Sequence, residues 1–404
     1  MRCLMLVAAL MLTGAASPAA AQPAQSPPLA WTAAAEGAPL ASAPALDVPE
    51  CNPPMLWFGS EYLMWFVRRE SSPPLVRFSS QMLPADGNLP AGSTAVVFPT
   101  DGRRIDYDYI NGARVTAGAW LNRQRTIGVE ASGFALEQRT DSFRFASPGL
   151  PILARFYINA NSQADTTLFF SRPDEFAGAL GVRAELSQLY SGEANVRFGG
   201  YTVFADRTDY IAGFRYFDMR ESIAINGRVD FPDDTRLFVN DHFRTQNQFY
   251  GLQFGLHAMY CGGSRFEATG TFKLGIGSMH QRVRITGDNR FEDVDGTVDQ
   301  EALGLYARPS NIGDFARNRF AVLPELNLNL AFRVTNNLKL TVGYNILYVS
   351  SVVRPGQAID PVVNDQDVRF IANPTTGPAN RPAFGFRGVD TTLQGFNFGA
   401  ALEF

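Results

Sequence analysis

Long stretches of this sequence alternate between apolar and polar residues, and this period of two constrains the fold more than any other feature. The clearest stretch runs from Gln248 to Tyr260. From Tyr250 onward its even positions carry Tyr, Leu, Phe, Leu, Ala and Tyr, whereas its odd positions include Gly, Gln, Gly and His. Such alternation gives a β-strand one apolar face and one polar or small face. The pattern recurs in Arg265–Gly277, Leu326–Phe332, Leu338–Tyr348 and Phe396–Phe404.

Alternation alone fits either a soluble sandwich or a membrane barrel, and strand length separates the two. These strands run for about 12 to 18 residues, whereas sandwich strands usually have about 5 to 6. Tyr250 and Tyr260 lie on one face, and at about 3.3 Å per residue and a tilt near 40° they span about 25 Å, the height of the lipid band of a barrel. The sequence contains no uninterrupted apolar stretch long enough for a transmembrane helix. We therefore predict an all-β, antiparallel up-and-down barrel in a membrane.

The order of strands and connections supports an outer-membrane barrel. We predict about ten strands, with twelve as the alternative, at residues 56–67, 112–121, 125–136, 180–199, 208–221, 247–261, 264–282, 319–334, 337–353 and 391–404. Long connections are predicted at residues 69–110, 139–178, 223–246, 284–318 and 354–390. Short turns alternate with them, as periplasmic turns alternate with outer loops in such barrels. Within 180–199, Gln188, Tyr190 and Gly192 break the alternation, which predicts either a bulge or two strands.

The N-terminus has the features of an export signal. Arg2 precedes an apolar run, and three alanines end at Ala21. We expect a cleaved signal peptide at 1–21, a Pro/Ala-rich disordered periplasmic lead-in at 22–54 and the barrel at 55–404. The expected location is the outer membrane of a bacterial cell with a Gram-negative type of envelope.

Charge and cysteine content add two constraints. The 35 basic and 39 acidic residues nearly balance, so no nucleic-acid partner is expected. Export would leave Cys51 and Cys261 in an oxidising compartment, where they could form a disulfide or remain free thiols. Their spacing does not decide between these alternatives.

Several motifs, in order along the chain, resemble those of the beta-barrel porin-7 family of bacterial outer-membrane proteins. They are Trp57–Trp65 (WFGSEYLMW), Pro73–Val76 (PPLV), Ser191–Arg197 (SGEANVR), Gly213–Asp218 (GFRYFD) with Glu221, Phe243–Gly251 (FRTQNQFYG), Pro309–Gly313 (PSNIG) and Ser350–Gly356 (SSVVRPG). The resemblance implies a barrel and an outer-membrane location from about residue 56 to Phe404. It supplies no reaction and no catalytic residues.

The histidines are the residues that best suit catalysis. His242, adjacent to Asp241, and His280 are predicted near the outer rim at roughly the same level. Acid–histidine pairs suit hydrolysis, so an outer-membrane hydrolase is one alternative. Both histidines are nevertheless predicted to face outward, and no nucleophile, zinc or nucleotide motif appears in a fitting context. We therefore expect no enzyme activity, no cofactor and no metal.

The inward-facing positions carry nearly balanced charge. The expected cations are Arg114, Arg183, Arg197, Arg215, Arg265, Lys273, Arg319, Arg333 and Lys339, and the expected anions are Glu61, Glu130, Glu185, Glu193, Glu267, Glu325 and Glu403. The residues predicted to line the lumen are Glu130, Arg215, Gln253, His257, Arg265, Glu267, Lys273, Glu325, Asn327, Asn329, Arg333 and Lys339. A selective pore often has one dominant sign of charge. A balanced interior in a barrel of about ten strands instead predicts a cross-linked, nearly filled lumen.

These observations predict a structural or surface-exposed outer-membrane barrel with a narrow or occluded lumen. A diffusion porin for small solutes is the main alternative. The expected partners are outer-membrane lipid, lipopolysaccharide and the barrel-assembly machinery, which would engage the C-terminal strand through Phe404 as an assembly signal. The sequence identifies no solute and no oligomeric state.

Overall fold

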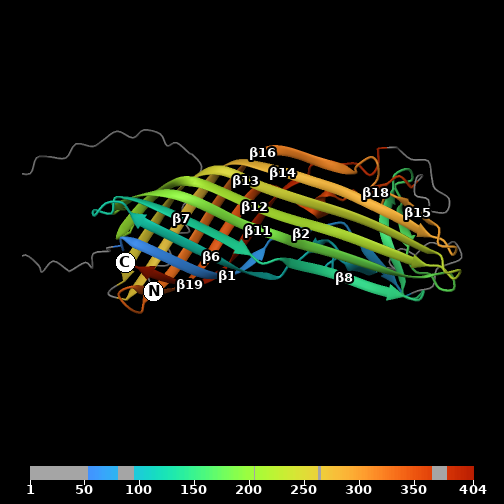
Figure 1. Ribbon diagram of the computed structural model, residues 1–404, viewed down its shortest axis with the longest axis horizontal. Coiled ribbons are helices and arrows are strands. Elements are labelled where there is room, and N and C mark those ends of the chain that lie inside the picture. The colour runs from blue at the N-terminus through green and yellow to red at the C-terminus, as the bar shows by residue number, and fades with distance from the viewer. Residues whose placement is uncertain (1–52, 81–94, 204, 263–264, 366–379) are drawn as a thin grey trace, which may run out of the picture. The chain divides into compact units, whose positions relative to one another are not determined.

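The computed structural model describes residues 53–80, 95–203, 205–262, 265–365 and 380–404. Ten antiparallel strands in these residues form a closed barrel (Figure 1). They are β1 (Leu56–Val67), β6 (Tyr109–Trp120), β7 (Ile127–Leu136), β11 (Ala177–Tyr201), β12 (Arg207–Asp230), β13 (Arg236–Gly262), β14 (Phe266–Glu292), β16 (Gly313–Arg333), β17 (Leu338–Val353) and β19 (Gly388–Glu403). Each pairs with its neighbours in this order, and β19 closes the barrel against β1. Among the described residues, no helix is long and apolar enough to cross a bilayer.

Part of the wall continues far beyond the closed barrel. β11, β12, β13 and β14 have 24 to 27 residues each, twice the length of β1 and β6. β8 (Arg139–Ser147) follows β7 along the edge of β11. We call this outer sheet the extension; it comprises β8 and residues 177–186, 218–230, 236–249, 278–292 and 313–319. A short strand, β15 (Val298–Glu301), pairs with the end of β14.

The extension corrects the predicted connections. Residues 223–246 are not a long loop, because β12 and β13 pair through this range and Asp230 lies opposite Arg236. The predicted loops 139–178 and 284–318 likewise contain β8 and the outer part of β14. The alternation persists in these segments, but most of their apolar residues face inward and, apart from the buried Asp241, most of their charged residues face outward. This reversal made them resemble polar loops.

The irregularity in β11 is a bulge within one strand. Its pairing with β12 shifts register between Leu186 and Gln188, close to the gap between β7 and β8. The bulge reverses which positions face inward. Leu186 is therefore buried on the inner side, whereas Arg183 and Glu185, which were expected to face inward, bond to each other on the outer surface.

The inner side of the extension is covered by segments that connect the strands. They contain β2 (Glu70–Ser71), β3 (Val76–Ser79), β4 (Ala95–Phe98), β5 (Arg104–Ile105), β9 (Ile152–Asn159), β10 (Asp165–Phe169), α1 (Pro355–Ala358) and β18 (Val362–Val363). One small sheet has the order β10-β9-β3-β4, with β18 parallel to β9, and a second joins β2 to β5. We call the described residues 70–80, 95–107, 148–176 and 354–365 the loop layer.

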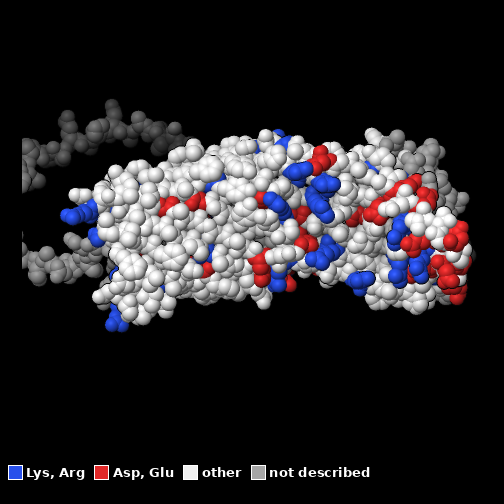
Figure 2. Space-filling view, viewed as in Figure 1, with Lys and Arg blue, Asp and Glu red and all other residues white. Residues whose placement is uncertain are grey.

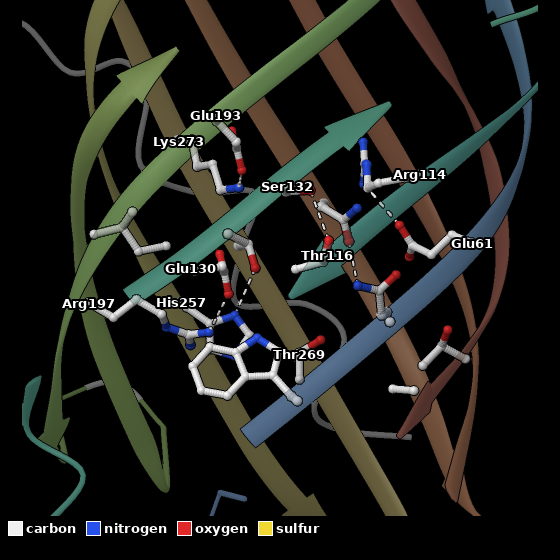
Figure 3. A pocket seen from close by; sticks show the side chains of 18 of the residues that line it. Glu61, Arg114, Thr116, Glu130, Ser132, Glu193, Arg197, His257, Thr269 and Lys273 are labelled. Atoms are coloured by element: carbon white, nitrogen blue, oxygen red, sulfur yellow. Dashed lines mark hydrogen bonds and ion pairs between the residues drawn. The ribbon is translucent and has the colours of Figure 1, made fainter. Parts of the chain in front are cut away.

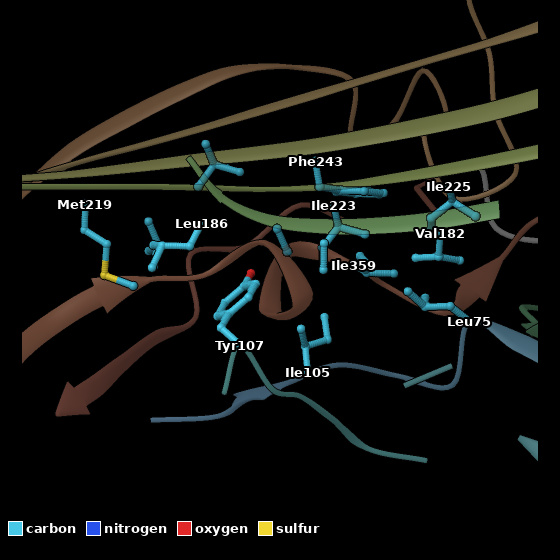
Figure 4. Close-up of a cluster of buried hydrophobic side chains, with 14 of the residues drawn as sticks. Leu75, Ile105, Tyr107, Val182, Leu186, Met219, Ile223, Ile225, Phe243 and Ile359 are labelled. Carbon is cyan, nitrogen blue, oxygen red and sulfur yellow. The ribbon is translucent and has the colours of Figure 1, made fainter. Parts of the chain in front are cut away.

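An apolar core joins the loop layer to the wall. Leu75, Ile105, Tyr107 and Ile359 of the loop layer face the wall residues Val182, Leu186, Met219, Ile223, Ile225 and Phe243 (Figure 4). All of these side chains are buried. Two glycines of the wall allow an especially close approach, because a Cβ atom at Gly178 or Gly227 would collide with Phe170 of the loop layer. The core therefore lies within the extension, inside the wall.

Candidate functional site: the barrel interior

The interior of the closed barrel is polar and contains a cavity of about 250 Å³ (Figure 3). Eight of the predicted lumen residues border this cavity, namely Glu130, Arg215, His257, Glu267, Lys273, Glu325, Asn327 and Asn329. They come from five strands, β7, β12, β13, β14 and β16, because every second residue of a strand faces the interior. Charged groups on different strands therefore lie close enough to pair.

Six residues form the central cluster, which consists of Glu61, Arg114, Glu193, Arg215, Lys273 and Glu325. Glu325 accepts from Arg114 at 3.1 Å and lies 2.6 Å from Arg215. Arg114 also pairs with Glu61, and Lys273 pairs with Glu193. The three cations and three carboxylates cancel in charge, and the pairs join strands that lie far apart in sequence.

A second cluster combines charge with two tryptophans. Arg197 donates to Glu130 and to Asp209, each at 2.8 Å. Its guanidinium lies 5.3 Å from the ring centre of Trp57. Arg207 pairs with Asp209 and stacks on Trp120. The sequence reasoning missed Asp209 and Arg207, although their odd positions share the inward parity of Arg215.

The third cluster lies near the short turns. Lys339 pairs with Glu267 and with Glu403, and Arg333 lies within 4 Å of both carboxylates. Arg265 does not follow the prediction. It is exposed in the turn before β14, because that strand begins only at Phe266.

The remaining predicted residues make local hydrogen bonds. Gln253 is fully buried and donates to Asn195 at 2.6 Å and to Glu193 at 3.0 Å. His257 bonds to Thr271 at 2.8 Å. Asn329 donates to Asn327. Phe404 pairs through its backbone with Leu56, so it lies at the seam where the barrel closes.

Two buried ion pairs connect the loop layer to the wall, and the sequence reasoning did not identify them. Arg354 donates to both oxygens of Glu221, at 2.6 and 3.0 Å. Arg155 pairs with Asp241, which also accepts from the backbone N–H groups of residues 305 to 307. Glu221 and Asp241 occupy inward positions on strands of the extension. That parity is the feature that could have revealed them.

Glu70 lies beside the first of these pairs. Burial raises the pKa of Glu70 to about 8, and this effect exceeds the opposing influence of Arg354, whose guanidinium is 3.9 Å away. Oε1 accepts from the N–H of Gly356, whereas Oε2 accepts no hydrogen bond within the described structure. The Glu70 carboxyl is therefore protonated at neutral pH, and Arg354 pairs mainly with Glu221.

The histidines do not come together. His242 lies opposite Thr286 and His280 opposite Gln248. They are therefore six residues apart along the ladder, about 20 Å at 3.3 Å per residue, and the expectation that they lie level is wrong. Asp241 faces the interior, whereas the adjacent His242 faces outward against Arg244.

Two further sequence questions concern metals and cysteines. Within the described ranges, no group of three or more His, Cys, Asp or Glu side chains could hold a metal ion. Cys261 is disulfide-bonded. Cys51, the signal peptide at 1–21 and nearly all of the lead-in at 22–54 lie outside the described residues.

Comparisons with known proteins identify a family. Residues 57–404 match the family described as beta barrel porin-7 (BBP7). No curated protein matches the chain. Among solved structures, the outer membrane protease OmpT from Escherichia coli is 10% identical with a TM-score of 0.41, and covers 86% of this chain and 96% of its own. A FadL homologue from Pseudomonas aeruginosa is 8% identical with a TM-score of 0.22, and covers 87% and 91%. Neither likeness carries an argument about function.

Proposed function

This chain belongs to the beta barrel porin-7 family, and from this premise we propose that it is a surface-exposed barrel of the bacterial outer membrane whose interior is closed to solutes. The closed barrel would cross the lipid, and the extension would project outside the cell. Two barriers in series would close the interior. One is the set of ion pairs inside the closed barrel, and the other is the loop layer inside the extension.

A belt of outward apolar side chains supports the membrane placement. Leu252, Phe254, Phe398 and Leu402 are among many large apolar residues of the closed barrel that are exposed on its outer surface. The corresponding half of the molecule carries few charged groups, whereas charges gather over the extension (Figure 2). An exposed apolar surface of this extent is stable against lipid and not against water.

The tight packing of the loop layer inside the extension is the main support for a closed interior. Its side chains are packed among inward residues of the extension, and Leu75, Tyr157 and Phe170 of the loop layer are almost completely buried. Packed protein interiors leave few voids larger than a water molecule. A solute would have to displace this apolar core, and the Arg354–Glu221 and Arg155–Asp241 pairs oppose such displacement.

The charge clusters supply the second barrier. Pairs such as Arg215–Glu325 bridge the interior, and the remaining cavity of about 250 Å³ lies among their side chains. The charges nearly cancel, so they would concentrate neither cations nor anions as a selective pore does. The proposal assigns no catalysis to His242 and His280, because in the described structure His242 bonds to Arg244 and His280 bonds to Asn318.

Liposome swelling with a small neutral sugar tests the proposal. The refolded full chain should swell liposomes no faster than empty vesicles. A triple variant, Arg114→Ala with Arg215→Ala and Lys273→Ala, should also remain closed, because the loop layer still fills the extension. Arg228→Ala, on the outer surface, is the matched control for loss of an arginine. Swelling by the wild type at the rate of a general porin would favour the diffusion-pore alternative.

A further inference from the structure

Arginines gather on the outer surface of the extension, close to its junction with the closed barrel. They are Arg183 on β11, Arg220 on β12, Arg244 on β13, and Arg282 and Arg284 on β14, and we call them the arginine patch. All five border one open groove of about 520 Å³, together with His242. Figure 2 shows basic groups gathered midway along the molecule, beside the nearly uncharged half. Neighbouring strands therefore present cations to the same side.

The centre of the arginine patch places like charges directly opposite each other. Arg244 and Arg284 are partners in the β13–β14 ladder. Like charges at such positions destabilise a sheet. In the described structure, neither forms an ion pair, whereas Arg183, Arg220 and Arg282 each bond to a carboxylate. The described structure therefore gives neither guanidinium an ion-pair partner, and Asp314, which lies opposite Arg284 in the β14–β16 ladder, pairs with Arg282.

His242 contacts Arg244 but does not neutralise its positive charge. Arg244 donates from Nε to Nε2 of His242 at 3.0 Å, so the imidazole must be neutral to accept. Burial, followed by the positive charge of Arg244, lowers the pKa of His242. The imidazole thus orients the guanidinium of Arg244 without neutralising it.

The arginine patch lies beyond the apolar belt, on the side toward the extension. Tyr216 lies opposite Tyr250, and their ring centres are 5.0 Å apart at the edge of the apolar belt that is nearer the extension. Tyr250 in turn lies opposite Ser278, so Arg284 is six residues farther along β14. At about 3.3 Å per residue and a tilt near 40°, this places it about 15 Å above the tyrosines. Tyrosines mark the membrane–water interface, so the backbone of the arginine patch lies on the water side of that interface.

We propose that the arginine patch binds the phosphate groups of lipid A, the lipid anchor of lipopolysaccharide. Guanidinium groups recognise phosphate through paired, charge-assisted hydrogen bonds. An anion between Arg244 and Arg284 would convert their repulsion into two attractions. The acyl chains of the same lipid would lie along the apolar belt below Tyr216 and Tyr250. This inference rests on the outer-membrane placement of the proposed function, but it does not depend on whether the interior is closed.

Lipid A retention provides the test. The refolded full chain in detergent would be incubated with lipid A that carries two phosphates, and bound lipid would be measured after gel filtration. Arg244→Gln with Arg284→Gln should reduce retention at least tenfold. Arg228→Gln with Arg290→Gln is the matched control, because these arginines share the outer surface of the extension but lie six residues farther from the membrane. This control should retain lipid A like the wild type.

Two further probes define the ligand. Dephosphorylated lipid A should be retained as poorly by the wild type as the phosphorylated lipid is by the double variant. Millimolar inorganic phosphate should not displace the bound lipid. Equal retention by all variants, or equal retention of both lipids, would overturn the proposal, and displacement by phosphate would show a site for a free anion. Liposome swelling measures the closed interior separately, so the two proposals can fail independently.

Discussion

β13 crosses both regions of the molecule, and its apolar residues face opposite sides of the wall in the two halves. In the closed barrel, Leu252 is 60% exposed on the outer surface, whereas its neighbour Gln253 is completely buried inside. In the extension, Phe243 is completely buried inside, whereas Arg244 lies exposed outside. The strand has no break between these residues. The period of two is therefore maintained while the apolar side changes.

The difference follows from what lies on each side of the wall. In the proposed placement, lipid surrounds the closed barrel and charged groups line its interior, so apolar residues face outward. Water surrounds the extension and the loop layer fills it, so apolar residues face inward, as in a soluble protein. One continuous sheet thus presents apolar residues to its surroundings in the closed barrel and to a buried core in the extension.

Loss of the last strand should have the largest effect. Deleting Phe396–Phe404 removes the partners of both β1 and β17 and leaves two open edges in lipid. We expect no heat-modifiable barrel in the outer membrane, as checked by gel mobility of membrane fractions. Assembly of the truncated chain into a heat-modifiable form would contradict the closure that we describe.

Charged substitutions should separate the two sides of the closed barrel. Leu328 is exposed on the outer surface, so Leu328→Arg should cost about 2 to 4 kcal/mol if it lies near the middle of the membrane. Asn329→Arg faces the interior and should cost less. Urea unfolding of the folded proteins in detergent measures both.

In the extension, an inward Arg substitution should cost more stability than an outward one, which is the reverse of the order in the closed barrel. Phe243→Arg faces the buried core and should destabilise strongly, whereas His242→Arg on the outer surface should have little effect. The same order in both regions would show that the apolar side does not change along the wall.

Adding one methyl group should destabilise the packed interior of the extension but not the interior of the closed barrel. Gly178→Ala forces a Cβ atom against the backbone of Phe170 in the loop layer, and overpacking of this kind costs about 1 to 3 kcal/mol. Gly59→Ala is the matched change in the closed barrel, where the nearest atom, the carbonyl of Ala400, is 3.9 Å from the new Cβ. Limited proteolysis should detect release of the loop layer in the first variant only. Equal protease resistance would argue against tight packing at Gly178.

A further prediction concerns the pH dependence of stability. The folded-state pKa of Glu70 is about 8, above its ordinary value of 4.5. The folded protein therefore binds more protons than the unfolded chain between these values, so stability falls as pH rises from about 4.5 to about 8. Glu70→Gln should remove this part of the dependence and equal or exceed the wild type in stability at pH 8. Parallel unfolding curves for both proteins from pH 5 to pH 8 would contradict a raised pKa.

The sequence predicted the closed barrel well because lipid imposes a simple rule on its outer surface. The ten strands and their inward parity at residues such as Glu325 follow from local alternation, whereas the break in alternation within β11 left a bulge and two strands as alternatives, and the structure shows a bulge. The extension was missed because Ile223, Ile225 and Phe243 alternate with polar residues on the opposite side. The Arg354–Glu221 pair joins residues 133 positions apart. No local pattern specifies such a contact, which depends on how the loop layer folds back into the wall.

Planar-bilayer conductance tests most directly the claim that two barriers lie in series. The proteins are the wild type, the triple variant Arg114→Ala with Arg215→Ala and Lys273→Ala, a loop-layer variant Arg155→Ala with Arg354→Ala, and the combination of all five changes. Heat-modifiability confirms that each is folded. We predict little or no steady current from the first three and clear channels only from the combination. Steady conduction by either partial variant would show that one barrier alone closes the interior, and conduction by the wild type would contradict both.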